Sequence, residues 1–288
     1  MLHEPIDTAR AISLIRERHR QRQDIHRAEK SLTLQIKAIC RRACAGLLSD
    51  ALRSGDMDRA AFLKRTKADA DVLYAALIDG EAHPLFLAVH PHIESFFQAR
   101  AMFQTQRRAI EKHLESLAVA LPIAPFVTAF RGLGMASLAA IVGEAGDLST
   151  YSTHSKLWRR LGLAPFDGKA PSTWRKKGGL SAEQWTEVGY SPIRRSIVWN
   201  AGQCVLKAQS ARVSKEGVVL REAGLYRLVY DARKQYELDR GIPKGHAHNR
   251  AIRYMDKKII RDLWRAWRAL SATDIAGDEI VEPQEKAA

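Results

Sequence analysis

Apolar residues recur at steps of three and four through the N-terminal part of the chain, at Ile25, Ala28, Leu32, Ile36, Ile39, Ala43 and Leu47. This is the repeat of one face of an α-helix. Asp7 and Thr8 are suitable residues to cap its start, and Ser54-Gly55 is a suitable end. The pattern predicts one long helix over residues 8–53.

Two further helices are expected in the same half of the chain, over residues 57–78 and 92–121. His83-Pro84 and His90-Pro91 mark the connector between them. The third helix carries apolar residues spaced by seven, which is typical of a helical hairpin or a short coiled coil: Phe96, Phe103, Ile110 and Leu117. This half of the chain shows no strand pattern. We therefore predict a helical stalk over residues 1–121, and we expect this stalk to form the interface of a homo-oligomer.

Beyond Pro122 the pattern changes to shorter helices separated by glycines. We expect helices over residues 123–130, 135–145, 153–161, 192–208, 220–240 and 247–270, with an irregular basic segment over residues 166–190. The fold class is therefore all-α, with a compact helical domain over residues 122–270. An acidic tail, residues 271–288, is expected to be disordered.

The positive charge is concentrated in the second half of the chain. The net charge is +14, and residues 151–268 contain 25 basic and 10 acidic residues, a net charge of +15. A charge of this size is typical of a protein that binds nucleic acid, although a solvated basic surface is the alternative. No apolar run is long enough to span a membrane, and no membrane partner is expected. Three cysteines, an odd number, favour a reducing cytoplasm over a disulfide framework.

A glycine turn lies between two of the predicted helices of the second region. Gly132 and Gly134 flank one apolar residue and follow Arg131, the pattern of a helix-hairpin-helix. Glycines allow a tight turn and a close approach to a phosphate, and the N–H groups at the start of the next helix point toward that anion. An ordinary corner between two helices would have the same glycines.

Four segments resemble, in order, the C-terminal transposase domain of the serine-dependent insertion-sequence recombinases of the one-hundred-ten, one-hundred-sixteen and nine-hundred-two group. They are Arg131–Ala139 (RGLGMASLA), Gly143–Leu148 (GEAGDL), Ser155–Pro165 (SKLWRRLGLAP) and Gly189–Arg195 (GYSPIRR). The resemblance covers residues 120–270. It implies DNA transposition, with a structured guide RNA as a further partner. It also implies an N-terminal domain of the ribonuclease H fold that binds metal through four acidic residues. Residues 1–120 do not resemble such a domain. No cofactor is therefore expected in this chain, and a divalent metal only if a separate acid domain is supplied.

The resemblance implies a serine nucleophile, and Ser172 is the best match for it. A serine that attacks phosphorus needs cations to neutralise the phosphate, and Arg175, Lys176 and Lys177 follow directly. A solvent-exposed loop serine without a catalytic role is the alternative.

Other basic and aromatic residues are candidates for nucleic-acid contacts. The arginine pairs Arg159-Arg160 and Arg194-Arg195 are expected to clamp phosphates or, alternatively, to lie on solvated helix faces. Tryptophans are interleaved with the basic residues. We expect core packing for Trp158 and Trp199, and base stacking is the alternative. Cys40 and Cys44 are expected to be buried thiols.

The leading hypothesis is a DNA-binding transposase of a mobile element, truncated or divergent, that acts through Ser172. The alternative is a non-catalytic nucleic-acid-binding or assembly protein derived from such a transposase. A purely structural helical scaffold is the third interpretation.

Overall fold

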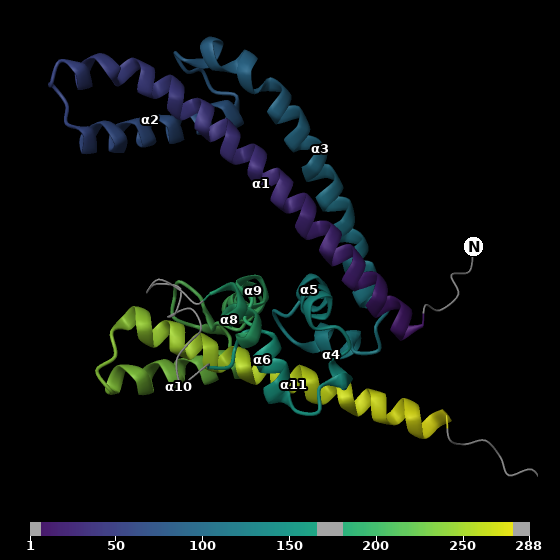
Figure 1. The fold of residues 1–288 in the computed structure, drawn as a ribbon. Coiled ribbons are helices and arrows are strands. Elements are labelled where there is room, and N and C mark those ends of the chain that lie inside the picture. Colours follow the sequence, from purple (N-terminus) through teal and green to yellow (C-terminus); the bar gives the residue numbers. More distant parts are fainter. Residues whose placement is uncertain (1–6, 166–180, 279–288) are drawn as a thin grey trace, which may run out of the picture. The chain divides into compact units, whose positions relative to one another are not determined.

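The computed structural model describes residues 7–165 and 181–278, and within these ranges it confirms an all-α fold (Figure 1). A single pair of short strands is the exception in this part of the chain. The chain divides into two compact units. One consists of residues 20–112, and the other combines residues 1–19 with residues 113–288. Residues 8–19 and 113–121 of the predicted stalk thus group with the C-terminal residues, and the stalk as one separate domain stays a prediction.

The unit of residues 20–112 is built from three helices. They are α1 (Thr8–Arg53), α2 (Arg59–Asp79) and α3 (Phe86–Val119), of which α1 and α3 continue into the other unit. The Asp58 carboxylate caps α2 by accepting a hydrogen bond of 2.8 Å from the Ala61 N–H. At the other end Gly80 adopts a left-handed conformation, with φ of 72°, which ends the helix.

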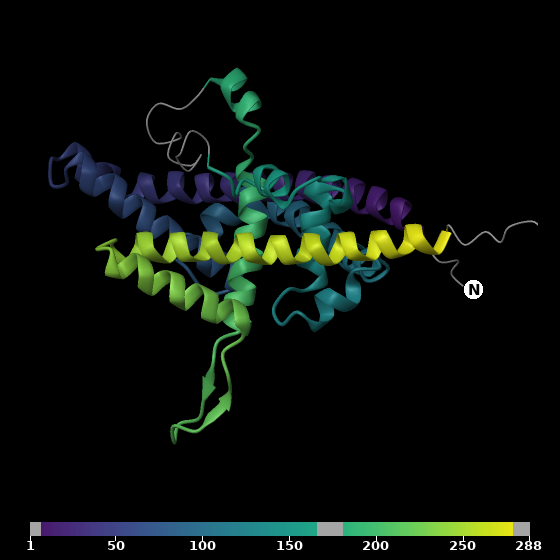
Figure 2. The same ribbon diagram turned by 90° about the horizontal axis from the view of Figure 1, so that it is seen from below.

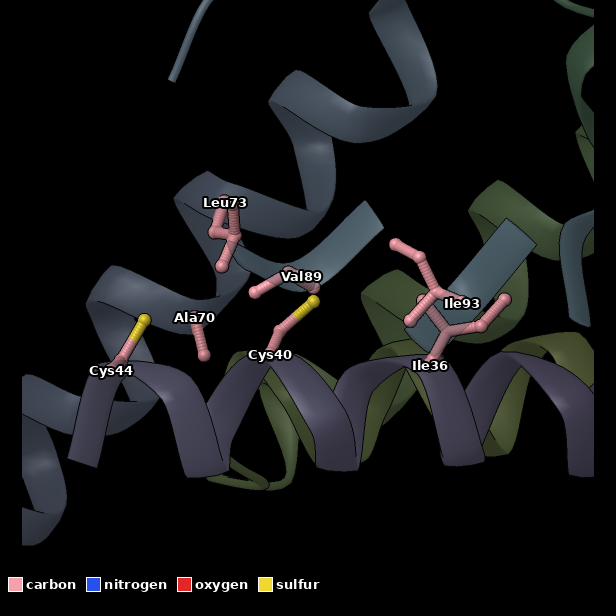
Figure 3. Close-up of a cluster of buried hydrophobic side chains, with 7 residues drawn as sticks. All are labelled: Ile36, Cys40, Cys44, Ala70, Leu73, Val89 and Ile93. Atoms are coloured by element: carbon pink, nitrogen blue, oxygen red, sulfur yellow. The ribbon is translucent and has the colours of Figure 1, made fainter. Parts of the chain in front are cut away.

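All three helices contribute to one buried cluster, which Figure 3 shows: Ile36, Cys40, Cys44, Ala70, Leu73, Val89 and Ile93. The predicted burial of Cys40 and Cys44 is confirmed, and burial raises the pKa of both thiols. Leu47, expected on the same face of α1, is exposed.

The third helix begins six residues earlier than predicted, so His90-Pro91 is not part of a connector. Pro91 is the sixth residue of α3, where only one backbone hydrogen bond is lost to its missing N–H. Val89 and Ile93 on either side of it are buried in the cluster of Figure 3. Burial of these two side chains stabilises the first turns by more than the single lost bond costs.

The second unit contains several short helices and the long helix α11 (Lys244–Asp278), besides the parts of α1 and α3 that belong to it. Its shorter helices are α4 (Ala124–Ala129), α5 (Met135–Ala145), the 3-10 turn η1 (Leu148–Thr150), α6 (His154–Arg160), α8 (Ala182–Val188), α9 (Pro192–Ala208) and α10 (Leu225–Asp239). In Figures 1 and 2 α10 folds back alongside α11. Trp264 of α11 is only half-buried, whereas five apolar residues of the same helix are buried: Ile252, Ile259, Ile260, Leu263 and Trp267.

Residues 212–221, predicted in part as helix, form a β-hairpin that projects from this unit (Figure 2). Strands β1 (Arg212–Val213) and β2 (Val219–Arg221) pair antiparallel across a turn in which Gly217 has φ of 84°. The Ser214 side chain accepts hydrogen bonds from two backbone N–H groups of that turn. These hydrogen bonds stabilise the turn where the sequence pattern predicts the start of a helix. As a result, α10 begins only at Leu225.

Two further predictions for this unit are wrong. Helix α8 lies within the segment predicted to be irregular, because Ser181 and Gln184 form a reciprocal capping box at its start. Helix α11 continues to Asp278, so the first part of the predicted tail, from residue 271, is helical. No proline or turn sequence follows residue 270 to end the helix there. Residues 279–288 lie outside the described residues.

Candidate nucleic-acid interface

The glycine turn lies between α4 and α5, as predicted, but Gly132 is used for packing within the protein. Its φ is 97°, and a Cβ at this position would lie 2.7 Å from the Val205 Cα in α9. Gly132 is therefore required for the close approach of the turn to α9. This contact gives Gly132 a structural role, and its predicted approach to a phosphate remains a prediction.

Gly134 lies in a different environment, at the N-terminus of α5. It is exposed, nothing lies within 4 Å of the position of its missing Cβ, and no side chain caps the helix. The first N–H groups of α5 therefore have no side-chain acceptor at this N-cap. This arrangement leaves the predicted backbone contact with a phosphate sterically open.

Arg131 lines a hollow of about 600 Å³ between the glycine turn and the base of the β-hairpin. Its guanidinium lies 3.4 Å from the Glu222 carbonyl oxygen, and its own carbonyl accepts a hydrogen bond of 3.0 Å from Gln209. Phe130 and Tyr226 stack at the wall of this hollow, with ring centroids 4.6 Å apart. The Arg131 side chain is thus accessible and tethered by one long contact.

Three of the four arginines in the two predicted pairs have partners within the protein. Arg159 is exposed. Arg160 donates two hydrogen bonds, of 3.0 and 2.9 Å, to the Glu144 carbonyl oxygen, and Arg194 forms an ion pair of 3.0 Å with the Glu144 carboxylate. Arg195 pairs with Asp256, an acid of α11. Arg160, Arg194 and Arg195 therefore form contacts that hold the unit together. Their role as phosphate clamps remains a prediction.

Ser172, Arg175, Lys176 and Lys177 lie outside the described residues, as does Trp174. The described chain stops at Pro165, directly after the Gly162 turn, and resumes at Ser181. At Gly162 φ is 71°, and a Cβ would lie 3.1 Å from the ring of Tyr190. The two resembling segments on either side of the gap are therefore in contact.

Half-buried tryptophans hold α11 against this part of the unit. The indole N–H of Trp158 donates to the Lys257 carbonyl at 3.0 Å, and that of Trp264 donates to the Tyr151 carbonyl at 3.0 Å. The expected packing role of Trp158 is thus confirmed. The expectation for Trp199 is wrong: its side chain is 41% exposed, because it lies away from the face of α9 that carries Val198, Ala201 and Val205.

One fully buried acid of this unit was not predicted from the sequence. Asp256 in α11 is fully buried and accepts a hydrogen bond of 3.0 Å from Arg195. Burial raises its pKa to about 7, although Arg195 acts in the opposite direction. The signal was present in the sequence, because Asp256 follows Ile252 by four residues and precedes Ile260 by four. A lone acid on the apolar face of a basic helix indicates a buried ionic contact.

Exposed cations lie along α11 and in the turn that precedes it. Five of them are Arg240, Lys244, Arg250, Arg265 and Arg268. Two tyrosines stand among the cations, with Arg233 4.8 Å from the Tyr236 ring and Lys258 5.5 Å from the Tyr254 ring. Cations interleaved with exposed aromatic rings are typical of a surface that contacts a nucleic-acid backbone and its bases.

The described residues offer neither a metal-binding cluster nor a membrane-spanning helix. No group of three or more histidine, cysteine or acidic residues there is placed to hold a metal ion. None of the helices in the described ranges is long and apolar enough to cross a membrane.

Comparison with known proteins gives one relative. The chain is similar to a protein of Streptomyces coelicolor named "Insertion element IS110 uncharacterized 43.6 kDa protein", with 27% identity over 100 residues. The matched segment covers 35% of this chain and only 23% of that protein. No family model and no solved structure matches the chain. The similarity relates part of this chain to a protein of a mobile element.

Proposed function

We propose that this chain is a DNA-binding protein of a mobile element, related to transposases. One observation carries the proposal: the excess of 25 basic over 10 acidic residues in positions 151–268, with exposed cations along α11 and in the turn that precedes it. The similarity to an insertion-element protein supports the mobile-element context. Such a surface binds DNA mainly through its phosphates, which releases counterions from the duplex.

A direct test is titration of a fluorescently labelled DNA duplex with the full chain, followed by anisotropy. The test variant carries Arg265→Glu and Arg268→Glu, two exposed positions of α11. The matched control carries Arg53→Glu and Arg59→Glu, two exposed positions of the other unit. The proposal expects the α11 variant to bind at least about tenfold more weakly than the control, since close phosphate contacts contribute strongly to affinity. Equal affinities of the two variants would refute it.

For the catalytic step we propose Ser172 as the nucleophile, on the resemblance stated above. The Ser172 Oγ would form a bond to phosphorus and lose its proton to a base outside this chain. The bond from phosphorus to the 3′ oxygen would break, and that oxygen would take up the proton held by that base and leave as a hydroxyl. Arg175, Lys176 and Lys177 would neutralise the charge that develops on the phosphate oxygens.

This step is tested by trapping the covalent link between protein and DNA under denaturing conditions, in the presence of a partner protein that supplies an acid domain. Ser172→Ala should abolish the link and leave DNA binding unchanged, whereas Thr173→Ala, the neighbouring hydroxyl, should retain it. A link that persists in Ser172→Ala would exclude this serine.

The second candidate is a non-catalytic binder that assembles with a full-length transposase on DNA or on a structured RNA. The intramolecular use of Arg160, Arg194 and Arg195 favours it, because these cations are already engaged within the protein. The two candidates differ in the trapping experiment: a binder gives no covalent link, and its Ser172→Ala variant behaves as the unmodified chain does.

A further inference from the structure

A hollow of about 270 Å³ lies between α10 and α11. From α10 it is lined by Arg233 and Glu237, and from α11 by Arg250, Arg253, Tyr254 and Lys257. The spacing explains why these residues meet, since positions 250, 253, 254 and 257 share one face of a helix, as do positions 233 and 237. The hollow belongs to the helical pair that lies side by side in Figures 1 and 2.

The lining carries a large excess of positive charge. Four of its six residues are cations and one is a carboxylate, so the hollow has a net charge of +3. The carboxylate, Glu237, is fully buried and pairs with Arg250 at 2.8 Å and with Arg233. The hydrogen bond from Arg250 holds the pKa of Glu237 below its ordinary value. Glu237 is therefore ionised, and its negative charge is shared by the ion pairs with these two arginines.

Arg253 and Lys257 have no such partner. The Arg253 Nε is buried without a hydrogen-bond partner, and its guanidinium makes one long contact, 3.4 Å, to the Gly162 carbonyl. The Lys257 Nζ lies 5.0 Å above the Trp158 ring and forms no ion pair with a carboxylate of the described residues. Burial lowers the pKa of both cations. At Arg253 repulsion by Arg195 adds to this effect while Tyr190 and Asp256 act in the opposite direction, and at Lys257 repulsion by Arg253 adds to it.

Two adjacent, partly buried cations that form no ion pair with a carboxylate of the described residues destabilise the free protein, and a bound anion relieves that cost. A tetrahedral phosphate group fits this arrangement, because guanidinium N–H groups and an ammonium group both donate to its oxygens. The volume accommodates one phosphate group and is too small for several stacked nucleotides. Tyr254, 38% exposed and 5.1 Å from the Arg233 guanidinium, places a ring beside the hollow on which an adjoining base can stack.

We propose that this hollow is the binding site for one phosphodiester group of bound DNA, with Arg253 and Lys257 as its direct ligands. Glu237 orients Arg233 and Arg250 at the rim. The identification of DNA as the source of the phosphate rests on the proposed function. The proposal of an anion site depends on the hollow, on its net positive charge and on the Arg253 Nε, which has no hydrogen-bond partner.

The test compares two variants that each remove two positive charges. The site variant carries Arg253→Gln and Lys257→Gln. The matched control carries Arg53→Gln and Arg59→Gln, two exposed positions of the other unit that do not line the hollow. Affinity for a DNA duplex is measured at one fixed salt concentration, together with the melting temperature of each protein without DNA.

The proposal expects the site variant to bind DNA at least about tenfold more weakly than the control, with a melting temperature equal to or above that of the unmodified chain. The melting temperature is expected to stay equal or rise because the variant removes two cations that repel each other. If Arg253 and Lys257 only stabilised the fold, their replacement would lower the melting temperature. Binding of DNA within about threefold of the control would overturn the site and leave the proposed function intact.

If the unmodified chain binds no DNA, the proposed function fails, and inorganic phosphate then tests the hollow by itself. The melting temperature is measured in phosphate and in chloride at equal ionic strength. A rise in phosphate that is present in the unmodified chain and absent in the site variant supports the anion site with another source of phosphate. Equal behaviour of the two proteins in phosphate overturns it.

Discussion

Asp256 occupies the space that a side chain at position 202 would need: a Cβ on Gly202 would lie 2.0 Å from the Asp256 Oδ1. The two residues join α9 and α11, and both are buried. The second oxygen of the same carboxylate accepts a hydrogen bond of 3.0 Å from Arg195. The missing side chain of Gly202 therefore admits an ion pair into the packed interface of two helices.

Gly202→Ala should destabilise the protein, because the new methyl group displaces the Asp256 carboxylate from Arg195. We expect a loss of about 1–3 kcal/mol from overpacking alone. Gly245→Ala, a position in α11 with nothing within 4 Å of its missing Cβ, should raise stability by about 0.4–1 kcal/mol. Urea unfolding followed by circular dichroism gives both values. Equal stability of the two variants would contradict this account of Gly202.

The Asp256 ion pair also predicts a dependence of stability on pH. Burial raises the pKa of Asp256 from 3.8 to about 7 in the folded state. A raised pKa gives stability that is fully present below pH 3.8 and is lost as the pH rises through about 7. Asp256→Asn removes this titration, so its stability relative to the unmodified chain should increase between about pH 4 and pH 8. Thermal melts of both proteins across this range measure the difference. A difference that is constant with pH, or that decreases, would exclude the raised pKa.

The two glycines of the turn should respond differently to the same substitution. Gly132→Ala places a Cβ 2.7 Å from the Val205 Cα at a φ of 97°, and we expect a loss of about 1–3 kcal/mol. Gly134→Ala meets no atom within 4 Å and should leave stability within about 0.5 kcal/mol of the unmodified chain. Urea midpoints distinguish the two. A fully stable Gly132→Ala would contradict the packing role given to that glycine.

In the other unit, Arg107 lies between two acids and should contribute to stability. It pairs with Glu29 at 2.8 Å and with Glu111 at 3.0 Å. Burial raises the pKa of Glu29, but hydrogen bonds from Arg107 and Gln104 outweigh it, and the pKa lies below its ordinary value. Arg107→Met should therefore cost about 2 kcal/mol near neutral pH. Because the folded pKa is lowered, this cost should decrease as the pH falls below about 4.5.

The matched control for that variant is Arg27→Met. Arg27 pairs with Asp24 at 2.8 Å, but the two side chains are 71% and 67% exposed, so the pair contributes at most about 0.5 kcal/mol. Denaturant titrations at pH 7 and pH 4 compare the two variants. If both lose the same stability at pH 7, the network of Arg107 has no special role.

Helices could be predicted from the sequence wherever a period of three and four extended over several turns. The first helix matched residues 8–53, and α5 and α9 matched their predicted bounds. The start of α3 could not be predicted, because tertiary burial of Val89 and Ile93 outweighs a proline that locally favours a break. The β-hairpin was missed because its strands of two and three residues are too short for an alternating pattern.

The candidate site was predictable in its charge and not in its geometry. The basic block and the glycine turn were visible in the sequence. The partners of Arg194 and Arg195 were not, since Glu144 and Asp256 lie about fifty and sixty residues away in the chain. For the same reason the hollow between α10 and α11 could not be foreseen. It needs the pairing of two helices that the sequence pattern does not specify.

The salt dependence of DNA binding tests the claim that the cationic surface along α11 and the turn that precedes it holds a sugar–phosphate backbone. The dissociation constant for a DNA duplex is measured with the full chain between about 50 and 200 mM salt. The account predicts that the logarithm of the association constant falls linearly with the logarithm of the salt concentration, with a slope of at least about 4, as expected for five or more phosphate contacts. An affinity that does not change with salt, or no binding at the lowest salt concentration, would contradict it.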